Sequence, residues 1–290
     1  MQLGIFAKTF LRSTLEENLD AVRTHGFDCV QYNLVCAGVP TLPDEIDPAL
    51  CKRICTAMVQ RQIGMAAVSG TFNIIHPDRA YRETHFRRLR TLAEACSALG
   101  TSMITLCTGT RDPENMWRHH PDNDSPTSWR EMAASVRKAV AIGEACGVTV
   151  GIEPEVNNVV DSAQKARRLL DEVGAECLKI IMDGANVFHE GELSRMHDVL
   201  DEAFELLGPD IALAHAKDLT RDGDAGHEAP GMGVLDYDHY LNRLHDAGFN
   251  GPLIAHGLDE GQALQCAAFL RDKLDHLAAG HGQPGTRGAK

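Results

Sequence analysis

Short apolar runs alternate with longer amphipathic stretches along the whole chain. The runs are continuously apolar, which is typical of strands that are buried on both faces of a parallel sheet. They predict eight strands, near residues 3–6, 29–33, 65–69, 103–107, 148–152, 178–182, 211–214 and 253–255. The amphipathic stretches predict eight helices, near residues 15–25, 49–61, 81–99, 129–146, 162–173, 193–207, 237–247 and 261–277.

Local signals mark several helix boundaries. Ser13 has Glu16 three residues later, which is the spacing of a capping box, and Asp161 is expected to cap the helix that follows it. Glycines that can adopt a left-handed conformation are expected to end seven helices. They are Gly26, Gly64, Gly100, Gly147, Gly174, Gly208 and Gly248. A helix–glycine–strand unit therefore repeats about every 35 residues.

Eight strands that are each followed by a helix predict a single-domain (β/α)8 TIM barrel. We assign residues 1–278 to the barrel and expect residues 279–290, which lack apolar periodicity, to form a flexible C-terminal tail. The competing fold is a doubly wound open sheet. Such a sheet usually has a glycine-rich phosphate loop after its first strand, and residues 7–10 (AKTF) do not resemble one.

Charge and composition narrow the classes of function. The chain has 28 Lys and Arg against 41 Asp and Glu, a formal charge of −13. This balance argues against a nucleic-acid partner and against binding to an anionic membrane surface. No apolar run approaches the roughly 20 residues that span a bilayer, and we find no signal-peptide pattern, so we expect a cytoplasmic protein. The nine cysteines are expected to be reduced core thiols.

Polar residues follow the last four predicted strands, where barrels of this class place their active sites. These residues are Glu153, Asp183, His215 and His256. Each alone has a plain structural explanation, such as a helix cap, a turn or a satisfied core histidine. Together they converge on one point, where unpaired buried charges would be costly and a metal ion would remove that cost. We therefore expect one divalent metal ion that is bound by all four side chains.

Four motifs resemble those of a known superfamily. They are IEPEVNN at 152–158, MDGAN at 182–186, HAKD at 215–218 and GMGVLDY at 231–237. In their order along the chain they are similar to motifs of the xylose isomerase-like TIM-barrel superfamily, the sugar phosphate isomerase/epimerase family of metal-dependent barrels. The resemblance extends over nearly the whole chain, through Leu277.

The resemblance implies metal ligands at Glu153, Asp183 and His215. It also implies a glutamate after the eighth strand, which serves family epimerases as fourth ligand and as second acid/base. This chain has His256 at that position. An imidazole can bind metal or transfer a proton near neutral pH, so we keep His256 as a ligand and a catalytic candidate. The two-glutamate epimerase mechanism does not carry over intact.

Further polar or aromatic residues are candidate substrate contacts. Arg111 could bind a phosphate or carboxylate, and a surface ion pair with Asp112 or Glu114 is the alternative. Trp117 could stack on a sugar or simply pack its loop, and Lys217 could bind substrate oxygens or be solvated. The full set of candidate substrate contacts is Arg111, Trp117, Glu155, Asn186, His189 and Lys217.

These expectations describe a metal-dependent isomerase or epimerase that acts on a sugar, sugar phosphate or related keto-polyol. Glu153 would be both metal ligand and base, and His256 or a nearby side chain would return the proton. Two alternatives remain open. One is a lyase or dehydratase acting on a keto-sugar or keto-inositol, because elimination needs one base and one acid at the leaving group. The other is a non-catalytic sugar-binding barrel.

The expected donor set also bears on the metal and the partners. Two carboxylates and two imidazoles favour a transition metal, and we expect Mn²⁺, with Zn²⁺, Co²⁺, Fe²⁺ or Mg²⁺ as alternatives. The expected partner is a small-molecule carbohydrate substrate, and a homo-oligomer is compatible with the sequence.

Overall fold

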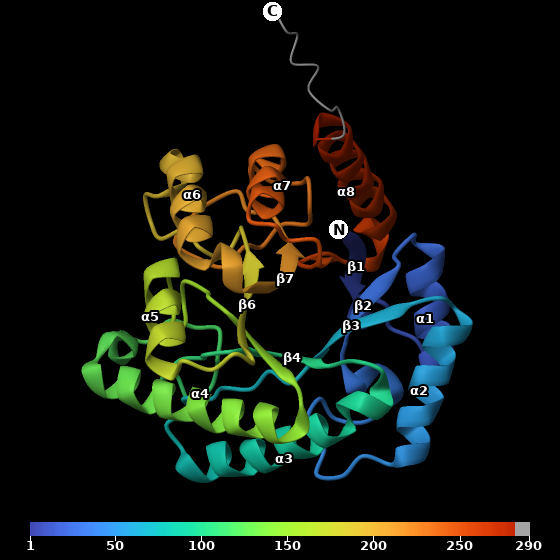
Figure 1. Ribbon diagram of the computed structural model, residues 1–290, viewed down its shortest axis with the longest axis horizontal. Helices are drawn as coiled ribbons and strands as arrows, with labels where there is room; N and C mark the ends of the chain where they lie inside the picture. The colour runs from blue at the N-terminus through green and yellow to red at the C-terminus, as the bar shows by residue number, and fades with distance from the viewer. Residues whose placement is uncertain (282–290) are drawn as a thin grey trace, which may run out of the picture.

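The structure is a computed structural model that describes residues 1–281. Eight parallel strands form a closed barrel in chain order, and the helices lie outside it (Figure 1). The strands are β1 (Gln2–Phe6), β2 (Cys29–Tyr32), β3 (Gly64–Ser69), β4 (Met103–Cys107), β5 (Thr149–Glu153), β6 (Leu178–Asp183), β7 (Ile211–Ala216) and β8 (Pro252–Ala255). The α-helices are α1 (Leu15–Thr24), α2 (Pro48–Gln60), α3 (Arg79–Leu99), α4 (Pro126–Cys146), α5 (Ala163–Val173), α6 (Met196–Leu207), α7 (Tyr237–Asp246) and α8 (Glu260–His281). The predicted fold class, a single-domain (β/α)8 barrel, is confirmed.

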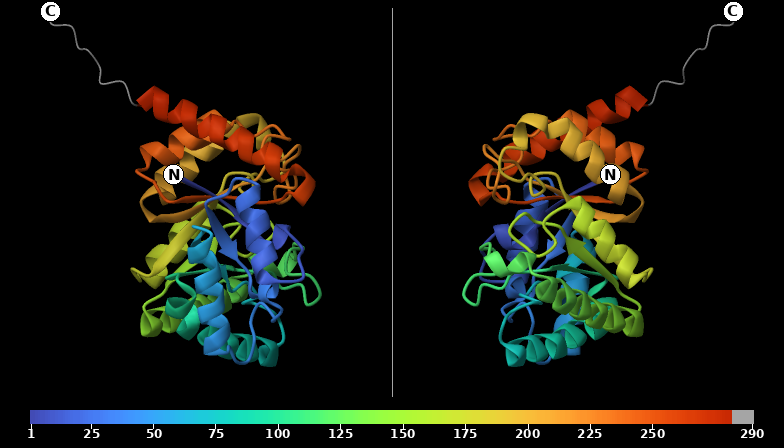
Figure 2. Two further views of the ribbon diagram at one scale, coloured as in Figure 1. Left: turned by 90° about the vertical axis from the view of Figure 1, so that its right-hand side faces the viewer. Right: turned by 90° about the vertical axis from the view of Figure 1, so that its left-hand side faces the viewer.

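Pairing between the first and last strands closes the ring. Residues of β1 pair with β8, with Gly4 opposite Ile254, and the N-terminus lies beside α8 (Figure 2). At the carboxyl ends of β6 and β7, Asp183 pairs directly with His215. Parallel register therefore brings the predicted site residues of neighbouring strands to the same level.

The barrel interior holds a small apolar layer beneath this end. Inward-facing residues alternate along each strand, as the period of two requires. The layer consists of Phe6, Cys29, Ala67, Met103, Ile181, Leu213 and Ile254. A larger apolar core, which includes buried residues of every strand and every α-helix, packs the α-helices against the outside of the barrel. The polar residues at the carboxyl ends of the strands therefore lie above an apolar layer in the barrel interior.

Two of the predicted helix caps are wrong by one residue. Thr14, rather than Ser13, accepts a hydrogen bond from the backbone N–H of Glu17 at 3.2 Å, and the Glu17 carboxylate accepts one from Thr14 N. Ser162, rather than Asp161, caps α5. The Asp161 carboxylate instead forms an ion pair with Lys165 Nζ, one turn into the helix, at 2.6 Å.

Other boundaries also differ from the prediction. Gly64 begins β3 and Gly208 begins a short 3-10 helix, so neither ends its helix in a left-handed conformation. The amphipathic stretch at 193–207 is divided into a 3-10 turn, Leu193–Arg195, and α6. Helix α8 continues to His281, past the expected boundary at 278, and the rest of the expected tail lies outside the described residues.

The expectations about cysteines and membranes can be compared with the described residues. All nine cysteines are free, and five of them are buried. Within residues 1–281, no helix is both long enough and apolar enough to cross a membrane.

Candidate functional site

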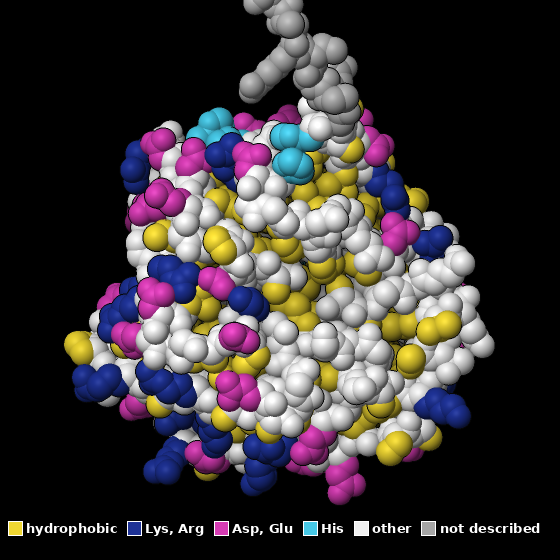
Figure 3. Space-filling model, viewed as in Figure 1, with side chains coloured by type: hydrophobic (Ala, Val, Ile, Leu, Met, Phe, Trp, Pro, Cys, Tyr) yellow, Lys and Arg dark blue, Asp and Glu magenta, His cyan; other side chains and the backbone are white. Residues whose placement is uncertain are grey.

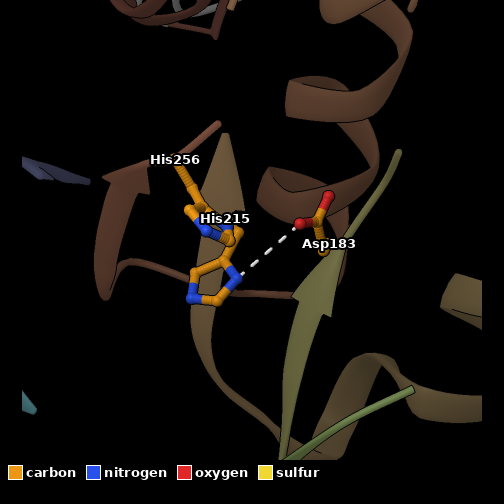
Figure 4. Close-up of side chains that lie close together, drawn as sticks. All are labelled: Asp183, His215 and His256. Carbon is orange, nitrogen blue, oxygen red and sulfur yellow. Dashed lines mark ion pairs between the residues drawn. The ribbon is translucent and has the colours of Figure 1, made fainter. Parts of the chain in front are cut away.

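Three predicted ligands meet at the carboxyl end of the barrel. Asp183 ends β6, His215 lies near the end of β7, and His256 directly follows β8. Potential ligand atoms of the three side chains lie within 4.8 Å of one another, and His215 Nδ1 is 3.7 Å from Asp183 Oδ2. Figure 4 shows the two imidazoles and the carboxylate turned toward one space. The side chains of Asp183 and His215 are fully buried.

Glu153, at the end of β5, joins this cluster through His215. Its Oε1 lies 3.3 Å from His215 Nδ1 and accepts a hydrogen bond from Asn186 Nδ2 at 2.7 Å. The other end of the Asn186 amide accepts a hydrogen bond from Gly226 N at 2.9 Å. Asn186 therefore orients Glu153 in this structure, and the contact with substrate that we expect of Asn186 stays a prediction.

The electrostatics of the cluster favour a bound cation. Burial disfavours the charged imidazole of His215, but the nearby Glu153 and Asp183 carboxylates outweigh it and raise the His215 pKa to about 9. Burial also disfavours the Asp183 carboxylate, but Lys217 and His215 hold its pKa well below the usual range. Two negative groups thus concentrate positive charge at His215 Nδ1, where a metal ion could replace the proton.

Two buried polar atoms in the cluster have no hydrogen-bond partner within residues 1–281. They are Asp183 Oδ2 and His256 Nδ1. A buried polar atom without a partner is costly, and such atoms are rare in folded proteins. A divalent ion would satisfy both, because a carboxylate oxygen and a neutral imidazole nitrogen are ordinary ligands of transition metals. The residues present therefore fit a divalent metal ion.

His256 is held as a neutral ring. It stacks on Phe6 with ring centroids 4.2 Å apart and planes at 24°. Burial, with the positive charges of Lys217 and His215, lowers the His256 pKa well below its usual value. A neutral imidazole is the form that binds metal, so this environment suits a ligand better than a proton donor.

Lys217 is buried beside the cluster and is not a solvated lysine. Its side chain is 6 % exposed, and its Nζ lies 3.4 Å from Asp183 Oδ2. The aliphatic stem runs between two glycines, where there is no room for a Cβ. A Cβ on Gly226 would lie 2.9 Å from Lys217 Cε, and one on Gly257 would lie 2.8 Å from Lys217 Cγ. This packing fixes an ammonium group beside the cluster.

Glu155 is a second carboxyl group in this region. It is 2 % exposed and accepts hydrogen bonds from Asn157 N, at 3.0 Å, and from the Asn158 side chain. Burial raises the pKa of Glu155 to about 7. The hydrogen bond from Asn157 lowers this pKa, and the negative charge of Glu153 raises it further. The chain therefore carries a carboxyl group near the cluster that is protonated in part of the population at neutral pH.

The other substrate-contact candidates have polar partners outside the four predicted ligands. Arg111 pairs with Glu131 at 3.1 Å rather than with Asp112 or Glu114, which both pair with Arg118. Within residues 1–281, none of the remaining three candidates has a hydrogen bond or ion pair with the four predicted ligands; these are Arg111, Trp117 and His189. Trp117 is 49 % exposed, and the imidazole Nε2 of His189 lies 4.0 Å from Asp161 Oδ1.

Several contributors to the site were assigned no role from the sequence, although Asp218 belongs to the HAKD motif. Gln31 in β2 lies 2.9 Å from His215 Nε2 through its Oε1. Asp218 accepts hydrogen bonds from three backbone N–H groups of the β7–α7 loop. The Tyr240 hydroxyl shares its proton between the carbonyl oxygens of Met182 and His215, both at 3.0 Å. A polar residue inside the apolar run of β2 was the available signal for Gln31.

A second group of metal-ligand residue types lies at the other end of the barrel. It consists of His245, Asp246 and His281, near the ends of α7 and α8, and Figure 3 shows histidine side chains at the surface there. The two imidazoles are stacked, with centroids 3.8 Å apart and planes at 21°. Because a metal binds in the plane of each ring, nearly parallel stacked rings do not converge on one ion. The group near β5–β8 is therefore the candidate metal centre.

Comparison with solved structures shows the same fold. 3-Keto-D-glucoside 4-epimerase YcjR from E. coli is 18 % identical, with a TM-score of 0.71 over 94 % of this chain and 99 % of that one. L-ribulose 3-epimerase is 16 % identical, with a TM-score of 0.77 over 100 % and 99 %. IOLI, in a structure with zinc bound, is 17 % identical, with a TM-score of 0.72 over 96 % and 99 %.

The sequence itself identifies the family. No curated protein matches the chain significantly. The family described as xylose isomerase-like TIM barrel matches residues 19–273, which include all of the strands except β1 and every predicted site residue. The chain belongs to the xylose isomerase-like TIM barrel family.

Proposed function

We propose that this protein is a divalent-metal-dependent isomerase or epimerase. Its substrate would be a sugar, sugar phosphate or related keto-polyol, from which it removes a proton next to a carbonyl group. The observation that carries the proposal is the cluster of Asp183, His215 and His256 beside Glu153, in which two buried polar atoms have no hydrogen-bond partner among residues 1–281. Two of the related structures are named as sugar epimerases and a third contains zinc, which supports this class of reaction.

The metal would be held by Glu153, Asp183, His215 and His256. When bound, a divalent ion polarises a substrate carbonyl and makes the neighbouring C–H more acidic. We propose Mn²⁺, with Zn²⁺, Co²⁺, Fe²⁺ and Mg²⁺ as alternatives, because two nitrogen donors favour a transition metal over Mg²⁺.

The chain's own residues then divide the work. Glu153 takes the proton, and the hydrogen bond from Asn186 Nδ2 keeps its carboxylate in one orientation. Lys217 Nζ, fixed beside Asp183, donates a hydrogen bond to the substrate oxygen on which negative charge develops. The neutral state of His256 fits a ligand better than the group that returns the proton.

A lyase or dehydratase is the second candidate, and two observations favour it. His256 supplies a neutral imidazole where a second carboxylate would otherwise face the substrate. Glu155, whose pKa is raised to about 7 by burial, offers a carboxylic acid that could protonate a leaving hydroxyl group. One base and one acid satisfy an elimination, and they leave the product one water poorer than the substrate.

Proton exchange in D₂O separates these functions. Keto-sugars and keto-inositols are incubated with the Mn²⁺-loaded protein, and the proton next to the carbonyl is followed by NMR. We expect wash-in of deuterium with the wild type, and a loss of about 10²–10⁴-fold in Glu153→Gln, the range that general-base catalysis contributes. Glu144→Gln, an exposed change on α4, is the matched control.

The outcomes distinguish the candidates clearly. Exchange with recovery of a sugar isomer supports the isomerase or epimerase, and loss of water supports the lyase. Bound metal without exchange on any substrate supports a sugar-binding barrel. If Glu153→Gln exchanges as fast as the wild type, Glu153 is not the base.

A further inference from the structure

Gln31 reaches across the barrel interior to the candidate metal centre. It lies in β2, which is separated from β7 by β1 and β8 in the barrel order. The residue is 3 % exposed, and its Oε1 lies 2.9 Å from His215 Nε2. A glutamine amide thus contacts the imidazole on the side away from Glu153 and Asp183.

The Gln31 amide lies with its NH₂ group toward β3 and β4. Its Nε2 donates to Thr105 Oγ1 in β4 at 2.9 Å and to Ser69 Oγ at the end of β3 at 3.3 Å. With the NH₂ group turned toward β3 and β4, the oxygen faces His215. An amide oxygen only accepts hydrogen bonds, so in this orientation the hydrogen is carried by His215 Nε2.

The other ring nitrogen is then left for a ligand. His215 Nδ1 faces Glu153 Oε1 at 3.3 Å and Asp183 Oδ2 at 3.7 Å. In an imidazole with its hydrogen on Nε2, Nδ1 carries the lone pair that a metal binds. The ring also packs against Phe6, whose ring meets it edge-on at 5.3 Å, and Tyr240 fixes the main chain by donating to the His215 backbone carbonyl.

We propose that Gln31 is a positioning residue that fixes the tautomer and the ring orientation of His215, so that Nδ1 is the metal-binding atom. This inference rests on the proposed metal site and assigns a role to a residue outside the proposed set of ligands. Metal-binding histidines commonly donate their second ring N–H to a fixed acceptor, and loss of that acceptor typically weakens metal binding about 10–100-fold.

Two substitutions at Gln31 separate this role from packing. Gln31→Met keeps the length of the side chain and removes the acceptor, whereas Gln31→Glu keeps an acceptor oxygen. Gln164→Met on the exposed face of α5 is the matched control for the same chemical change. The full-length proteins are stripped of metal and titrated with MnCl₂ by calorimetry, and thermal melting without metal checks that each is folded.

We expect the dissociation constant for Mn²⁺ to rise about 10–100-fold in Gln31→Met and to stay close to wild type in Gln31→Glu and Gln164→Met. Nitrogen-15 NMR of the zinc-loaded proteins, with the His215 signals assigned by their loss in His215→Asn, reads the tautomer directly. It should show the hydrogen on Nε2 in the wild type and in Gln31→Glu.

Three results would overturn the inference. Unchanged affinity in Gln31→Met, or equal weakening in Gln31→Met and Gln31→Glu, would show that the acceptor oxygen does not matter. A hydrogen on Nδ1 in the wild type would contradict the assigned tautomer. In these cases the proposed function stands, whereas a wild type that binds no divalent metal would overturn both.

Discussion

Asp218 organises the loop that joins β7 to α7. Its Oδ1 accepts hydrogen bonds from Leu219 N and Leu235 N, both at 2.9 Å, and its Oδ2 accepts one from Gly231 N at 3.0 Å. The residue is 1 % exposed. One buried carboxylate therefore ties the start, the middle and the end of the loop together. Because this loop supplies Gly226, which packs on Lys217, the carboxylate also supports the candidate site.

Asp218→Ala should destabilise the loop strongly. It leaves three backbone N–H groups without their acceptor, and each unmade buried hydrogen bond costs about 1–3 kcal/mol. Water can enter the opened loop and recover part of this, so we expect a loss of about 3–5 kcal/mol. That is a large share of the roughly 5–15 kcal/mol that stabilises a typical folded protein.

Asp218→Asn should cost less. The asparagine oxygen can keep the bonds from Leu219 and Leu235, and only the bond from Gly231 is replaced by a contact between two donors. Burial raises the pKa of Asp218, although its backbone hydrogen bonds lower it. The neutral asparagine side chain therefore also avoids part of the cost of burying a charge. We expect a loss of about 1–3 kcal/mol for this variant.

The assay combines urea unfolding with amide hydrogen exchange. Protection of the Leu219 and Leu235 amides reports the loop itself, and the urea midpoint reports the whole barrel. Asp224→Ala, an exposed carboxylate in the same loop, is the matched control. We expect protection to fall in the order wild type, Asp218→Asn, Asp218→Ala. If Asp218→Ala keeps the protection and the midpoint of Asp224→Ala, the carboxylate does not hold the loop.

Three further predictions concern the site. His215→Ala should abolish metal binding while the barrel still folds, since residues at the carboxyl ends of strands serve the site; elemental analysis and far-UV circular dichroism test this, and an unfolded variant would indicate a structural role. Tyr240→Phe should lower the free energy of unfolding by about 1–2 kcal/mol, because the carbonyls of Met182 and His215 lose a shared donor; an unchanged urea midpoint would contradict it. Mn²⁺ at 100 times the wild-type dissociation constant should stabilise the wild type by about 2.7 kcal/mol, and excess EDTA should reverse this. The same stabilisation of His256→Ala at that same Mn²⁺ concentration would remove His256 from the ligand set.

The sequence predicted the elements well because their cause is local. Strands that are buried on both faces are continuously apolar, so each one was visible as a short run. Cap residues were less certain because Ser13 and Thr14 are both good caps, and the choice depends on backbone angles. Thr14 has φ −130° and ψ 155°, the extended geometry of a cap.

The site was predictable where chain order implies proximity. Asp183 and His215 end neighbouring strands, and their parallel register alone brings them together. Contacts made through the barrel interior are different, because they depend on how the ring closes. For this reason, Gln31 contacts His215 only once the barrel is closed. The ion pair of Arg111 with Glu131 depends instead on how α4 packs beside the loop that carries Arg111.

Phe6 and His256 meet where the first strand of the barrel pairs with the last. Their encounter requires nearly the whole chain to have been synthesised, and contacts between such distant segments form slowly. A nascent or proteolytically shortened chain that ends before β8 would carry Glu153, Asp183 and His215 without the fourth proposed ligand. With the proposed ligand set, the four-ligand site would be complete only once β8 pairs with β1, so metal uptake would report the closure of the barrel during folding.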